Sequence, residues 1–142
     1  KRELVALKEV AQRELINGRP LAEDPLFAAR ITQVEIELMA LEMTVMRVLS
    51  ARGKAPGPEA SILKIRGTEI QQTLSELMME AMGPYALPFD LDAMELEYQG
   101  ERVGTDYAGP LAAHYFNYRK VTIYGGSNEI QRNIIAQMVL GL

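Results

Sequence analysis

The sequence of 142 residues contains no cysteine, no tryptophan and a single histidine, His114. Without cysteine the chain has no disulfide framework, no thiolate metal site and no cysteine nucleophile. One histidine does not make a metal site, and a packed polar role for His114 is the simpler interpretation, so we predict no metal centre. The lack of cysteine is compatible with a reducing compartment, and we predict a cytoplasmic protein.

The chain also lacks a strong charge of one sign and a long apolar run. Fifteen basic and 19 acidic residues give a net charge of -4, and the basic residues are scattered rather than striped, which argues against nucleic-acid binding. No apolar run approaches the roughly 20 residues that a membrane-spanning helix requires. The length suits one domain with its own core. Because the chain opens at Lys1 inside an apparent helix and without Met, we expect residues 1–142 to be one domain of a longer protein.

Apolar residues recur at helical spacing along much of the chain. An apolar stripe predicts a first helix over residues 2–17, which Gly18 ends. Asp24 and Pro25 then form a strong start signal, because aspartate caps free backbone amides and proline fits the first helical position. The second helix is expected to run from there to about residue 51.

The middle of the chain holds a turn, a long helix and an acidic segment. Glycine and proline mark a turn at residues 53–58, and a third helix follows from Pro58 to about Met82, with Lys64 and Arg66 expected on its solvated face. Two long helices joined by a short connection should pack antiparallel. The acidic residues 84–106 are expected to form a surface insertion with one irregular helical turn. A short helix is expected at 111–118. With a last helix near the end of the chain, the pattern predicts an all-α bundle of about four main helices.

Near the end of the chain, residues 122–136 read TIYGGSNEIQRNIIA. An extended apolar pair is expected to lead into Gly125 and Gly126, which permit backbone angles that a side chain would prevent. A helix then begins, with Ser127 as its cap and Glu129 at its positive end, and Gly141 ends it. Such a turn suits a polar ligand, although a glycine turn before a capped helix is also a common structural feature. The face predicted to be buried consists of Ile130, Ile134, Ile135, Met138 and Val139.

This ending resembles the C-terminal signature of the acyl-CoA dehydrogenases, whose members read Tyr-Glu-Gly-Thr-x-x-Ile-Gln-Arg or Tyr-Gly-Gly-Ser/Thr-Asn-Glu-Ile there. The resemblance extends over nearly the whole chain, through residues 18–21, 56–61 and the helix end near Gly83. It implies the helical C-terminal domain of an enzyme that uses FAD to oxidise an acyl-CoA thioester to the 2-enoyl-CoA. It also implies a homo-oligomer, either a dimer or a tetramer, with an electron-transfer flavoprotein as electron acceptor.

Carried over position by position, the resemblance implies a ligand site at the glycine turn. Gly126, Ser127 and Glu129 match residues that contact FAD. Tyr124 and Gly125 match the turn beside the flavin and the substrate thioester.

A second contact is implied at the end of the third helix, where Glu80 and Gly83 match a segment that reaches the FAD of a neighbouring subunit. The family often has glutamine at the position of Glu80 and Gly-Gly where this chain has Gly83–Pro84. A carboxylate at Glu80 would place a negative charge near a pyrophosphate, which argues against this contact.

The site has no catalytic base of the usual kind. Gly125 occupies the position of the catalytic glutamate in many family members, and glycine cannot take a proton. Some branches place the glutamate on an earlier helix, so we predict a base upstream of Lys1 and an inactive isolated domain. Glu129 is an alternative base, but a helix-start residue in contact with the cofactor explains it better. A catalytically silent partner subunit and a flavin-free helical association module remain the alternative functions.

Overall fold

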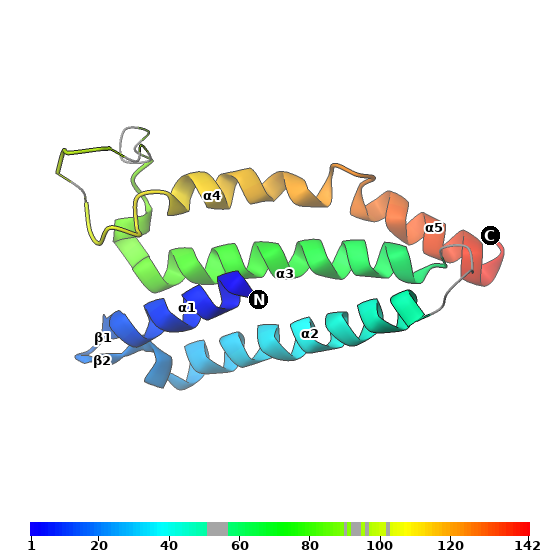
Figure 1. The fold of residues 1–142 in the computed structure, drawn as a ribbon, viewed down its shortest axis with the longest axis horizontal. Coiled ribbons are helices and arrows are strands. Elements are labelled where there is room, and N and C mark those ends of the chain that lie inside the picture. Colours follow the sequence, from blue (N-terminus) through cyan, green and yellow to red (C-terminus); the bar gives the residue numbers. More distant parts are fainter. Residues whose placement is uncertain (51–56, 90, 92–94, 96, 102) are drawn as a thin grey trace.

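The computed structural model describes residues 1–50, 57–89, 91, 95, 97–101 and 103–142. Figure 1 shows an all-α bundle in which the third helix is central, with the second helix on one side and the last two on the other. This confirms the predicted fold class. None of the helices in the described ranges has the length and apolar character needed to cross a membrane. The helices are α1 (Arg2–Arg13), α2 (Pro25–Ser50), α3 (Glu59–Met82), α4 (Leu111–Tyr118) and α5 (Asn128–Leu140).

The first helix is shorter than predicted. It ends at Arg13, and β1 (Leu15–Ile16) pairs antiparallel with β2 (Arg19–Pro20) in a hairpin. The two turn residues, Asn17 and Gly18, have φ values of +53° and +77°. An Asn-Gly pair favours positive φ at both central positions of a hairpin turn. The prediction of helix through residue 17 was therefore wrong because this local turn preference takes precedence over the continuing apolar stripe.

The second helix begins where the sequence indicated. The Asp24 Oδ1 atom accepts hydrogen bonds from the Leu26 and Phe27 amides, at 3.0 and 2.8 Å. These bonds satisfy two of the free amides of the first turn, as expected of a helix cap. α2 runs antiparallel to α3, as predicted (Figure 1). The predicted turn at 53–58 lies mostly outside the described residues.

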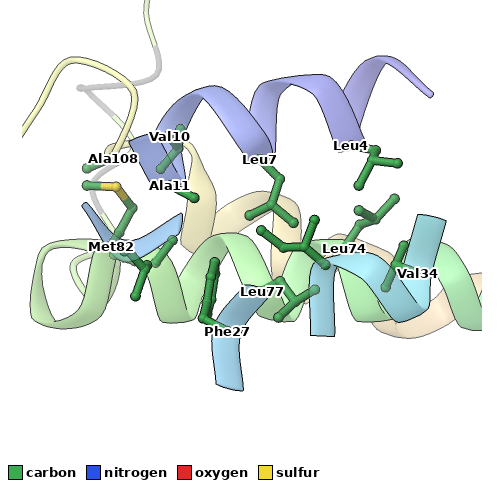
Figure 2. Close-up of a cluster of buried hydrophobic side chains, with 14 of the residues drawn as sticks. Leu4, Leu7, Val10, Ala11, Phe27, Val34, Leu74, Leu77, Met82 and Ala108 are labelled. Carbon is green, nitrogen blue, oxygen red and sulfur yellow. The ribbon is translucent and has the colours of Figure 1, made fainter. Parts of the chain in front are cut away.

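The core forms where α1, α2 and α3 meet. Figure 2 shows Leu7 of α1 directed toward Leu74 and Leu77 of α3. Leu7 and Leu77 are completely buried, and Phe27 and Val34 of α2 close the same cluster. Burying one such side chain contributes about 1.5–3 kcal/mol. The core therefore fixes α3 as the scaffold on which the later helices pack.

The last helix differs from the expectation. Ile130, Met138 and Val139 are exposed, Ile134 and Ile135 are only partly buried, and the buried residue of α5 is Asn128. The predicted buried face was wrong because α5 packs chiefly against α3, which covers one narrow stripe. Part of the second helix is similarly uncovered, with exposed side chains at Ile36, Met39, Met43, Met46 and Leu49.

The segment between α3 and α4 is a surface connection, as expected. Its irregular helical turn is the 3-10 helix η2 (Gly83–Ala86). The described acidic side chains beyond it are exposed, while Asp90, Asp92 and Arg102 lie outside the described residues. The Tyr107 hydroxyl donates a hydrogen bond to Glu14 Oε1 at 2.5 Å and so ties the end of this segment to α1.

Candidate functional site

The glycine turn lies between the 3-10 helix η4 (Arg119–Thr122) and α5. Ile123 has φ -105° and ψ -53°, so the expected extended entry to the turn was wrong: helical backbone continues from α4 through η4 to this residue. Gly125 and Gly126 have φ values of +68° and +84°. Residues with a Cβ rarely adopt this left-handed region, which confirms that the turn uses the conformational freedom of glycine.

The surroundings of the two glycines differ. A Cβ at Gly125 would meet no heavy atom within 4 Å, whereas a Cβ at Gly126 would lie 2.6 Å from Gln131 Nε2. The Gln131 amide in turn donates to the Gly125 carbonyl oxygen at 3.4 Å. Ile123 and Tyr124 are both exposed. The turn therefore presents bare backbone on one side and two large, exposed side chains beside it.

The start of α5 is capped as predicted. The Ser127 Oγ atom accepts a hydrogen bond from the Ile130 amide at 3.4 Å. The pKa of the Glu129 carboxyl lies below its ordinary value because its own backbone amide and the Ser127 hydroxyl donate hydrogen bonds to it, with smaller effects from the charges of Arg132 and Lys64. A carboxylate that loses its proton more readily is a weaker base, which counts against Glu129 as a proton acceptor.

A buried polar contact fastens this turn to α3. Asn128 is only 5% exposed, and its Oδ1 accepts a hydrogen bond from Lys64 Nζ at 2.7 Å. The same Lys64 ammonium donates to the Thr122 carbonyl at 3.2 Å. The Thr68 hydroxyl lies within hydrogen-bond distance of the Asn128 amide group. Lys64 is therefore not the solvated cation that its position on a helix suggested, whereas Arg66 is exposed and ion-paired.

The Lys64 contact belongs to a polar stripe along α3 that holds the segment leading into the turn. Gln72 Nε2 donates to the carbonyls of Tyr118 and Arg119, at 3.2 and 3.3 Å. The Arg119 guanidinium donates to Ser75 Oγ at 2.9 Å and to Glu76 Oε1 at 2.8 Å. The spacing of three and four residues could have revealed this stripe in the sequence. Its members are Lys64, Thr68, Gln72, Ser75 and Glu76.

The second predicted contact region lies at the opposite end of α3. Glu80 forms an ion pair with Arg30 of α2, which offsets the negative charge that argued against a pyrophosphate contact. Gly83 ends α3 with a φ of +54°. At 1.5 Å rise per residue, Lys64 and Glu80 are roughly 24 Å apart along the helix. The structure therefore does not bring Glu80 and Gly83 together with residues 124–129.

His114, the single histidine of the chain, contacts Tyr118 and lies near Glu3. The ring of His114 stacks on Tyr118 with centroids 4.1 Å apart, and its Nε2 lies 3.9 Å from Glu3 Oε1. The residue is nevertheless exposed, so the predicted packed role holds only for its contact with Tyr118. Within the described ranges, no three His, Asp or Glu side chains gather as they would around a metal ion.

The turn is compatible with a flavin. A flavin ring is flat, with apolar faces and a polar edge. The open side of Gly125 leaves room for a flat group to approach the backbone, and Tyr124 supplies an exposed aromatic surface. Ser127 and Glu129 add polar groups at the start of α5, where the helix dipole is positive. These residues could therefore contact both the face and the edge of the ring.

Comparison with known proteins agrees with this geometry. Residues 1–140 match the family model described as "Acyl-CoA dehydrogenase, C-terminal domain". Acyl-CoA dehydrogenase IpdE1 of Mycobacterium tuberculosis is 32% identical over 141 residues, which are 99% of this chain and 32% of that protein. IpdE1 of Mycolicibacterium smegmatis is 31% identical over 129 residues, 91% of this chain and 29% of that protein.

Among solved structures, the ChsE4-ChsE5 complex from Mycobacterium tuberculosis has the same fold, with a TM-score of 0.76 and 24% identity over 99% of this chain and 35% of that one. The chain thus spans about a third of the length of the relatives that it matches. The family match covers nearly every residue, and the turn, the capped helix and the bundle agree with it. The chain therefore belongs to the acyl-CoA dehydrogenase family, in which it corresponds to the C-terminal domain.

Proposed function

We propose that this domain is part of an FAD-dependent enzyme that dehydrogenates an acyl-CoA thioester between its α and β carbons. The turn at residues 123–127 then lies beside the flavin and the thioester. The geometry of the turn supports this function most directly: two left-handed glycines, an exposed aromatic residue and a helix cap lie between Thr122 and Asn128, which are both bonded to Lys64 of α3. The 32% identical relative IpdE1 is named an acyl-CoA dehydrogenase.

The residues at the start of α5 would hold the cofactor. Gly126 gives the backbone its left-handed turn into the start of α5, Ser127 offers its hydroxyl, and the Glu129 carboxylate accepts hydrogen bonds from cofactor N–H or O–H groups. FAD, when bound, accepts the hydride that leaves the β carbon of the substrate. The contribution of this domain is to orient the cofactor, which is the usual role of the protein in such enzymes.

Tyr124 and Gly125 would line the thioester side of the site. Because Gly125 carries no side chain, the α proton must go to a carboxylate elsewhere, and we assign this base to a part of the enzyme that precedes Lys1. Gly125 also supports a second candidate function, that of a partner subunit which binds flavin without catalysis.

Other parts of the surface would contact a neighbouring subunit. Glu80 and Gly83 would reach the FAD of a neighbouring subunit, and the Arg30 partner of Glu80 makes this acceptable next to a pyrophosphate. The exposed apolar side chains of α2 and α5 support a homo-oligomer, either a dimer or a tetramer. An electron-transfer flavoprotein is the acceptor that we propose for the reduced cofactor.

The test is to express the complete reading frame and to record its visible spectrum without oxygen, before and after adding a series of acyl-CoA thioesters. Bleaching of the flavin absorbance by one of them supports the dehydrogenase and a base outside residues 1–142. A flavin spectrum that no thioester bleaches contradicts the dehydrogenase and supports the silent subunit. Purified protein that neither contains nor takes up FAD contradicts both and supports a flavin-free association module.

A further inference from the structure

One side chain of α3 connects the two ends of the glycine turn. Lys64 Nζ donates to the Thr122 carbonyl, the last residue of η4, and to Asn128 Oδ1, the first residue of α5. Of the residues proposed to contact the flavin and the thioester of the same subunit, Tyr124, Gly125, Gly126 and Ser127 lie on the loop between these two points, and Glu129 lies one residue beyond it. Figure 1 shows this loop between α4 and α5, with α5 running from it toward the end of the bundle at which α3 begins.

We propose that Lys64 is a positioning residue for the flavin site, which sets the width and orientation of the glycine turn. This inference rests on the proposed function, because it assumes that the turn binds FAD. It adds Lys64 to the proposed flavin site as a residue that does not itself touch the cofactor. Lys64 acts on the turn through Thr122 and Asn128.

The two hydrogen bonds from Lys64 to Thr122 and Asn128 form a clamp across the turn. The turn needs this clamp because its own conformation is weakly restrained. Its two glycines can adopt many backbone conformations, and ordering them has a large entropic cost. Ile123 and Tyr124 are exposed, so they provide little packing to hold the loop. The Gln131 contact to the Gly125 carbonyl is long, at 3.4 Å. Two hydrogen bonds from one ammonium group are therefore the strongest described restraint on the separation of the loop ends.

The chemistry of the clamp favours lysine. Both acceptors are neutral oxygen atoms, and hydrogen bonds from a charged donor are stronger than bonds between neutral groups. Asn128 is buried, so a change that removes the ammonium would leave its side-chain oxygen with only the weak Thr68 contact, at 3.4 Å. An arginine at position 64 retains the charge and several donors, and could restore part of the clamp.

The experiment compares Lys64→Met, Lys64→Arg and Arg66→Met in the complete protein, with FAD affinity measured by titrating the FAD-free protein. Arg66 lies on the same helix, but its ion pairs with Glu37 and Glu69 are on the surface. We expect Lys64→Met to weaken FAD binding by roughly ten- to a hundredfold, because two charge-assisted bonds are lost. Lys64→Arg should recover part of the affinity, and Arg66→Met should retain the wild-type value.

Two further variants separate positioning from stability. Leu77→Ala removes a fully buried core side chain away from the turn, so it should lower the unfolding temperature but leave FAD affinity unchanged. Asn128→Ala removes one arm of the clamp and should weaken FAD binding in the same direction as Lys64→Met, which keeps the test valid if Lys64→Met does not fold. Wild-type FAD affinity and flavin spectrum in Lys64→Met, or in Asn128→Ala if Lys64→Met does not fold, would overturn the role of Lys64. A wild-type protein that binds no FAD would instead overturn the proposed function.

Discussion

Three glycines make it possible to compare one substitution, glycine to alanine, in three backbone environments. Gly67 lies within α3, where an added Cβ would contact Leu41 Cδ2 at 3.9 Å, an ordinary van der Waals distance. Gly125 and Gly126 both have positive φ, but only at Gly126 would the Cβ collide with a neighbour, Gln131. The structure therefore predicts three different changes in the free energy of unfolding.

The magnitudes follow from these environments. Gly67→Ala should stabilise the chain by about 0.5–1 kcal/mol, because alanine loses less conformational entropy in a helix. Gly125→Ala should destabilise it by about 1–2 kcal/mol, which is the strain of an L-residue in the left-handed region. Gly126→Ala should cost about 0.5–1 kcal/mol more than Gly125→Ala, because Gln131 must move and lose its bond to the Gly125 carbonyl.

The assay is urea unfolding of the 142-residue chain, followed by far-ultraviolet circular dichroism. With a urea dependence of about 1–3 kcal/mol per molar, the Gly125→Ala midpoint should fall by roughly 0.3–2 M. Gly125→Glu should behave like Gly125→Ala, because the space around the Cβ is open. If Gly125→Ala were as stabilising as Gly67→Ala, the left-handed conformation of the turn would be refuted.

Two other properties follow from the structure. Leu77→Ala should lower the free energy of unfolding by about 3–5 kcal/mol. Leu26→Ala, at a residue that is 78% exposed, should change it by less than about 0.5 kcal/mol. Equal effects of the two substitutions in urea unfolding would contradict the assigned core. The pKa of Tyr107 is raised above its ordinary value of 10.0 by its hydrogen bond to Glu14 and by burial. The native state thus holds this proton more tightly than the unfolded state. The titration of Tyr107 should therefore leave the free energy of unfolding unchanged below pH 10 and should lower it as the pH rises above 10. Tyr107→Phe should show a shallower alkaline decline in urea midpoint, and an unchanged slope would contradict the assignment.

The sequence was sufficient wherever neighbouring residues decide the structure. Asp24 caps α2 and Ser127 caps α5 through bonds to amides two or three residues away, so their chemistry could be recognised without tertiary information. The positive φ angles of Gly125 and Gly126 follow from the same kind of local preference. The hairpin at Asn17 was also encoded locally, and the prediction failed there because the Asn-Gly signal was interpreted only as the end of a helix.

The exposure of each helix face could not be read from periodicity. Periodicity identifies the apolar stripe of α5, but it cannot tell whether another element covers that stripe. Ile130, Met138 and Val139 have the spacing of buried residues and yet are exposed, because α5 has α3 as its main described neighbour. The exposed methionines of α2 illustrate the same difference between an apolar face and a covered one.

By itself, the sequence determined the all-α class, the helix caps and the chemical character of the glycine turn, because each depends on residues within a few positions of one another. The tertiary structure alone showed that Lys64 reaches Asn128 and that Arg30 neutralises Glu80, across 64 and 50 positions of the chain. It also separated Glu80 from the turn by most of the length of α3. Such contacts depend on how helices pack in space, and helix packing is set by the whole buried core rather than by any local run of residues.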